Sequence, residues 1–293
     1  MSKKFISILI IAALVLTLIF PILNIVRADT IKLVVSLGAD LTKEQQEQIL
    51  DYMDVNREDV NIIETTIQEE AHYLKDTPAI QHIGNKTISS ALVERLGEDS
   101  GMTVETHNIT WVSEDMYANA LITAGVKDAR IIAAAPFEVS GTGALTGIMK
   151  AFEEITGEKL DEDAKKIASE EMVITGELGE ELEDKGKASE LVKRVKEKII
   201  EEGIKNPEDI KRIIIEIQHD LNINLSDEQI QKLTELMNRI KNIDINIDDL
   251  KEQVSKIGEK AKELAEDSQE IKSLLQRIGD FISQLVQKIM SIF

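Results

Sequence analysis

The sequence predicts a mixed α/β (or α+β) domain followed by an all-helical region, and three observations lead to this fold class. Between residues 29 and 157, short runs rich in β-branched side chains alternate with amphipathic runs of helical spacing. From residue 158 onward the patterns are helical, and no aromatic residue occurs between Phe152 and Phe281. The aromatic content of 3% and the charged content of 30% also favour helices packed through aliphatic side chains.

In the first region, we expect strands over residues 31–37, 60–67, 104–112 and 130–135, the last closed by Pro136. Helices are expected over 42–54, 88–96, 113–125 and 144–155. Thr42 and Gln45 form a capping-box pair, and glycines follow the last three helices at positions 97, 125 and 157. We therefore assign residues 29–157 to the α/β domain.

In the helical region, residues 158–293, helices are expected over 161–183, 187–202, from 206 onward and over 226–242. Asn206 precedes Pro207, which is typical of a helix start, and Ser226 with Gln229 forms another capping box. A last helix over 247–293 has apolar residues spaced alternately by about four and three positions, the pattern of a coiled-coil seam.

Composition excludes several classes of function. The chain of 293 residues contains no cysteine, so disulfides, thiolate nucleophiles and cysteine-ligated metals are excluded. Its formal net charge of −20 argues against nucleic acid as a partner, because phosphate binding needs a surplus of Lys and Arg.

Residues 1–28 have the pattern of a signal peptide. Lys3 and Lys4 precede an uncharged apolar run from Phe5 to Phe20, and the small residue Ala28 predicts cleavage before Asp29. An uncleaved membrane anchor is the alternative, if the apolar run extends through residues 22–26. Either way we expect a secreted or extracytoplasmic protein, and the absence of cysteine suits a Gram-positive envelope.

Several short segments are similar to a known family. These are residues 36–40 (SLGAD), 108–112 (NITWV), 116–120 (MYANA) and 135–147 (APFEVSGTGALTG). Together they resemble the YpuA-like family of exported Firmicutes proteins, the domain of unknown function 1002. The resemblance implies an exported envelope protein and carries over no reaction, substrate or catalytic residue.

The loop Ser140, Gly141, Thr142 and Gly143 lies between an expected strand and an expected helix. Free backbone N–H groups at such a helix start could hold a phosphate or carboxylate. The alternative is a turn in which glycine allows a positive φ and Ser or Thr caps the helix.

No catalytic or metal signature emerges from the sequence, and no cofactor is expected. The four histidines include no HExxH pattern, and Glu69, Glu70 and His72 are interpreted as a solvated helix face. Trp111 and Tyr117, with Phe137, are interpreted as core anchors, with a ligand-lining role as the alternative.

The end of the last helix is a candidate membrane or partner helix, because its apolar face widens and its charges are mainly basic. Packing within the chain and homo-oligomer formation are the alternatives. The residues that carry this expectation are Ile271, Lys272, Leu275, Arg277, Ile278, Phe281, Ile282, Leu285, Lys288, Ile289 and Phe293.

Taken together, these patterns favour an exported, non-enzymatic binding or interaction protein. A cell-wall or small-ligand hydrolase with a site near Ser140–Gly143 is the alternative.

Overall fold

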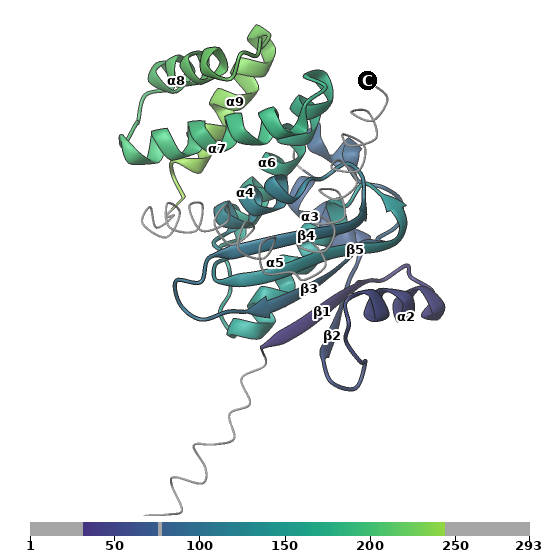
Figure 1. Ribbon diagram of the computed structural model, residues 1–293. Helices are drawn as coiled ribbons and strands as arrows, with labels where there is room; N and C mark the ends of the chain where they lie inside the picture. The colour runs from purple at the N-terminus through teal and green to yellow at the C-terminus, as the bar shows by residue number, and fades with distance from the viewer. Residues whose placement is uncertain (1–31, 76–77, 244–293) are drawn as a thin grey trace, which may run out of the picture. The chain divides into compact units, whose positions relative to one another are not determined.

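The computed structural model describes residues 32–75 and 78–243, and within them a five-stranded mixed sheet with the helices that cover it is followed by four consecutive helices over residues 162–240 (Figure 1). The strands are β1 (Leu33–Gly38), β2 (Asn61–Thr65), β3 (Ser90–Arg95), β4 (Met102–Ile109) and β5 (Ala129–Val139). Their order is β2-β1-β3-β5-β4. β1 and β2 are parallel, as are β4 and β5, whereas β3 runs antiparallel to both of its neighbours.

The two faces of the sheet are buried by different helices. One core cluster joins Val34, Val93 and Ile131 to α4 (Glu114–Ala124) and α5 (Thr142–Thr156). The other joins Val35, Leu92 and Ile132 to α2 (Lys43–Tyr52). Alternate residues of a strand point to opposite faces of the sheet, so the central strands carry apolar side chains on both faces.

Helices α6 (Glu162–Glu181), α7 (Lys185–Glu201), α8 (Pro207–Asp220) and α9 (Asp227–Ile240) form a further core cluster. α6 contributes to two cores: Ala168 and Met172 belong to the sheet cluster, and Ile167 and Leu178 to the helical one. The mixed α/β region followed by helices is therefore present, and α6 buries a face against each part.

Most expected helices are confirmed together with their caps. Thr42 and Ser226 each form a capping box, Asp161 caps α6, and Asn206 precedes Pro207 at the start of α8. Gly125 ends α4 in the left-handed conformation. These signals are local, so the sequence carries them without tertiary information.

One expected helix is wrong: residues 90–95 form strand β3, not part of a helix over 88–96. This strand pairs on both sides, with β1 and β5, and its first four residues are buried. A strand buried on both faces has no alternating pattern, so its periodicity resembles that of a buried helix.

Three further features depart from expectation. The strand expected over 60–67 is observed as β2 and ends at Thr65, because Thr66 and Glu69 form a capping box that starts α3 (Ile67–Leu74). β5 continues through Pro136 to Val139, and a short 3-10 helix covers Pro78–His82.

Within the described ranges, no helix is both long and apolar enough to cross a membrane. The expected signal peptide with its cleavage site at Ala28 and Asp29, and the expected coiled-coil helix over 247–293, lie outside the described residues.

Candidate functional site

The loop Ser140–Gly143 leads from β5 into α5, and most of it is covered. Ser140 is exposed, whereas Gly141, Thr142 and Gly143 are buried. Gly141 is the N-cap of α5, has a φ of +99° and provides no side-chain cap. The expected positive φ is therefore present, but the expected Ser or Thr cap is wrong, because glycine occupies the capping position.

Gly141 is held by close contacts with its neighbours. The Tyr117 hydroxyl donates a 2.5 Å hydrogen bond to the Gly141 carbonyl oxygen. A Cβ atom at Gly141 would lie 2.4 Å from Cγ2 of Ile109 and 2.6 Å from Oη of Tyr117. Burial, together with the charge of Glu70, raises the pKa of Tyr117. The loop therefore packs against a neutral hydroxyl rather than against solvent.

A carboxylate from another helix lies against the first turn of α5. Glu70 of α3 is 4% exposed and accepts a hydrogen bond from the Thr142 side chain. A Cβ atom on Gly143 would lie 3.1 Å from Oε2 of Glu70. Glu70 therefore lies beside the N-terminus of α5, the end of a helix that favours negative charge.

The environment of Glu70 is polar but contains an unsatisfied oxygen. Oε1 of Glu70 and the hydroxyl of Thr87 have no hydrogen-bond partner among the described residues. Burial raises the pKa of Glu70, with the Thr142 hydrogen bond opposing it. The sequence interpretation of Glu70 as part of a solvated face is wrong; the Thr66–Glu69 capping box was the signal that could have located its helix.

Glu69, Glu70 and His72 do not converge. Lys150 Nζ donates a 2.6 Å hydrogen bond to Oε1 of Glu69, whereas His72 lies 4.0 Å from an exposed Glu162 carboxylate. In the described parts of the chain, no three His, Asp or Glu side chains are grouped as a metal site would require.

Of the three aromatic residues expected as core anchors, only Trp111 and Tyr117 pack against the core. Tyr117 is fully buried and Trp111 packs partly buried against the sheet cluster. Phe137 is 48% exposed, so its interpretation as a core anchor is wrong. It lies in the part of β5 beyond Pro136, where the strand leaves the buried core.

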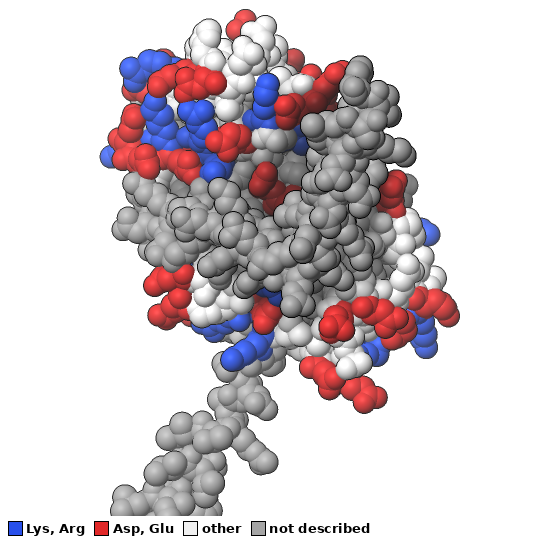
Figure 2. Space-filling model, in the orientation of Figure 1, with Lys and Arg blue, Asp and Glu red and all other residues white. Residues whose placement is uncertain are grey.

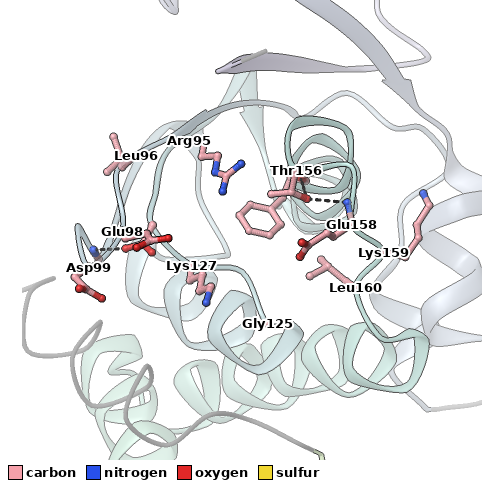
Figure 3. Close-up of a pocket in the computed structure, with 13 residues that line it drawn as sticks. Arg95, Leu96, Glu98, Asp99, Gly125, Lys127, Thr156, Glu158, Lys159 and Leu160 are labelled. Atoms are coloured by element: carbon pink, nitrogen blue, oxygen red, sulfur yellow. Dashed lines mark hydrogen bonds between the residues drawn. The ribbon is translucent and has the colours of Figure 1, made fainter. Parts of the chain in front are cut away.

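A pocket of about 480 Å³ lies at the other end of α5, where that helix ends at Thr156 (Figure 3). None of the described residues that line it belongs to the Ser140–Gly143 loop. It is lined by Arg95, Leu96, Glu98, Asp99, Gly101, Gly125, Lys127, Asp128, Phe152, Thr156, Glu158, Lys159 and Leu160.

Hydrogen bonds between two chain connections shape one wall of this pocket. The Asp128 carboxylate accepts a 2.9 Å bond from the Gly101 N–H, and the Asp128 carbonyl accepts a 2.7 Å bond from Leu96 N–H. Asp128 and Asp99 adopt φ values of 48° and 58°, a left-handed conformation that Asp tolerates better than most residues. The wall is therefore preformed.

The pocket carries charges of both signs. Arg95, Lys127 and Lys159 line it together with Glu98, Asp99, Asp128 and Glu158. In Figure 3 the Arg95 guanidinium and the Glu158 carboxylate point toward the same space, whereas Lys159 points away. Lys159 instead pairs with Glu153 at 2.8 Å. Arg95 forms no ion pair with any other residue in the described ranges.

Other charged groups form ion pairs between neighbouring helices. Lys and Arg intermingle with Asp and Glu over α7 and α8 (Figure 2), where Arg194 pairs with Asp220 and Lys198 with Glu216. Such partly exposed pairs contribute little stability. Among the described residues, the pocket at the end of α5 is the better candidate for recognising a ligand, because it combines a hydrogen-bonded wall with charges of both signs.

Comparison with known proteins assigns the family. The sequence profile of the family described as "Protein of unknown function (DUF1002)" matches residues 37–257. The chain belongs to this family. The "Uncharacterized protein YpuA" of Bacillus subtilis (strain 168) is 38% identical over 294 residues, covering 100% of both chains. No solved structure matches the chain.

The family match of this DUF1002 chain spans both regions described above. Residues 37–257 include Glu70, the Ser140–Gly143 loop and every residue that lines the pocket. They end before Ile271, so the candidate membrane or partner helix lies beyond the matched range and outside the described residues.

Proposed function

We propose that this DUF1002 protein is an exported, non-enzymatic binding protein of the cell envelope, which holds a small polar ligand in the pocket at the end of α5. The observation that carries the proposal is the preformed pocket of about 480 Å³. This volume lies within the range of roughly 300–1,000 Å³ that is typical of small-molecule sites.

Export is supported by the position of the predicted cleavage site. The compact unit begins at Leu33, a few residues after Ala28 and Asp29. Removal of residues 1–28 would therefore take nothing from the sheet or its helices. The Lys-flanked apolar run before this point provides the targeting signal.

Export is tested by expressing the full chain in a Gram-positive host and determining the N-terminus of the recovered protein by mass spectrometry. We expect a protein in the envelope or medium that begins at Asp29. A membrane-bound protein that begins at Met1 would overturn cleavage but not export, and a protein confined to the cytoplasm would overturn export.

Binding is tested by screening small polar fragments against the protein that begins at Asp29, using NMR chemical shifts. Fragments should perturb the signals of pocket residues, including Arg95 and Thr156, at lower fragment concentrations than the signals of α2. An Arg95→Gln variant should weaken these shifts, whereas Arg57→Gln, in an exposed pair with Glu47, should not. Fragments that perturb only residues outside the pocket would overturn the proposed site.

A further inference from the structure

Two helix ends contribute to the pocket and favour a positive group. α4 ends next to Gly125 and α5 ends at Thr156, and both of these residues line the pocket. A helix C-terminus carries partial negative charge, which Lys or Arg in its last turn often offsets. Neither helix has a basic residue in its last turn. The Glu158 carboxylate adds a full negative charge immediately after α5.

Arg95 supplies the opposite charge. It ends β3, lines the pocket and forms no ion pair within the described residues. A guanidinium binds a carboxylate through two parallel hydrogen bonds, which fixes both position and orientation. The geometry in Figure 3, with Arg95 and Glu158 pointing toward one space, matches a molecule that carries one charge of each sign.

The four carboxylates of the lining disfavour ligands with several negative charges. Glu98, Asp99 and Asp128 lie on the connections at one wall, and Glu158 lies beyond the end of α5. A phosphate-rich ligand would meet these like charges, whereas a simple cation would leave Arg95 unpaired. A zwitterion satisfies both groups.

We infer that the pocket binds a free amino acid or short peptide as its zwitterion, with the carboxylate at Arg95 and the ammonium group toward Glu158. This inference rests on the proposed function, because it assigns a ligand class to the same pocket. It adds the orientation of the ligand, which the fold alone does not define.

The experiment compares three dipeptides by calorimetry on the protein that begins at Asp29: Ala-Ala, N-acetyl-Ala-Ala and Ala-Ala amide. Ala-Ala should bind at least about tenfold tighter than either blocked form, since tenfold is the loss expected from a single charge-assisted hydrogen bond. Arg95→Gln should abolish the advantage of the free carboxylate, and Glu158→Gln that of the free ammonium group. Arg57→Gln and Glu47→Gln, an exposed pair on other elements, serve as matched controls.

Equal binding of all three dipeptides, or no binding of Ala-Ala, would overturn the zwitterion inference. In that case, fragments that still perturb the pocket residues would leave the proposed binding function standing. If neither dipeptides nor fragments bind in the pocket, the inference and the proposed function both fail.

Discussion

The Glu70 carboxylate accepts a hydrogen bond from the side chain of Thr142, which joins α3 to the first turn of α5. A negative charge is favoured at a helix N-terminus, but Glu70 is 4% exposed and its Oε1 lacks a partner among the described residues. Desolvation outweighs the hydrogen bond, so the pKa of Glu70 is raised in the folded protein.

This raised pKa makes stability depend on pH. The folded protein retains the Glu70 proton above the ordinary pKa of 4.5, where the unfolded chain loses it. The contribution of Glu70 is therefore greatest below this pH and is lost as the pH rises through the folded pKa. We expect Glu70→Gln to stabilise the protein at pH 8 by about 1–3 kcal/mol, because the neutral amide avoids the desolvation cost of a buried carboxylate charge. Urea denaturation from pH 4.5 to pH 8 measures the difference.

Glu69, the residue before Glu70, provides a control because its pKa is shifted in the opposite direction. Burial raises the pKa of Glu69, but hydrogen bonds from Lys150 and Thr66 outweigh it and lower the pKa overall. The stability from Glu69 is present above its unfolded pKa and is lost as the pH falls through the folded one. Glu69→Gln should therefore destabilise at neutral pH. A Glu70→Gln variant that behaves like Glu69→Gln would contradict the raised pKa of the buried Glu70 carboxyl group.

Substitution of Gly141 by alanine should be more damaging than the same change at Gly157. Both residues have positive φ, so each substitution costs about 1–2 kcal/mol. A Cβ atom at Gly141 also collides with Ile109 and Tyr117, whereas at Gly157 nothing lies within 4 Å. We expect Gly141→Ala to cost at least about 1 kcal/mol more, measured by chemical denaturation. Equal losses would show that the loop can move away from its neighbours.

Gly176 should be required for the packing of Trp111. A Cβ atom at Gly176 would lie 2.3 Å from the Trp111 ring, and the indole N–H donates a 2.9 Å bond to Glu180 of the same helix. Gly176→Ala should displace the ring and shift its fluorescence to longer wavelength. Because the chain contains one tryptophan, the emission reports this site alone.

Gly186→Ala is the control for Gly176, since its Cβ would lie 3.4 Å from Asp184 and within 4 Å of no ring atom in the described residues. Its emission should be unchanged. An unchanged spectrum in Gly176→Ala as well would contradict the close packing of Trp111 on α6.

Breaking a buried ion pair of α7 should lower the free energy of unfolding more than breaking an exposed ion pair of the same helix. Lys196 and Glu171 are each 1% exposed in their side chains and lie 2.7 Å apart, and Lys196 also donates to Thr123. Glu171→Gln should cost about 3–5 kcal/mol, because it leaves a buried ammonium group without its counter-charge. Glu216→Gln, which breaks the exposed pair with Lys198, should cost at most about 1 kcal/mol. Similar losses in thermal denaturation would contradict a specific role for the buried pair.

How far the fold follows from the sequence depends on the range of the interactions involved. The capping boxes at Thr42 and Ser226, and the left-handed glycine after α4, are satisfied within a few residues, so their patterns locate the helices. The sequence predicts a helix where strand β3 lies, because the burial of this strand comes from β1 and β5, which are distant in sequence.

The candidate site shows the same division. The sequence predicts a glycine with positive φ in the Ser140–Gly143 loop, because φ is a local property, but it assigns the cap of the following helix to Ser or Thr and not to Gly141. The contact of Glu70 with Thr142 at that helix start, and the shared pocket of Arg95 and Glu158, follow from the packing of distant segments and have no local signal. These residues belong to separate elements, and only the packing of the sheet and its helices brings them together.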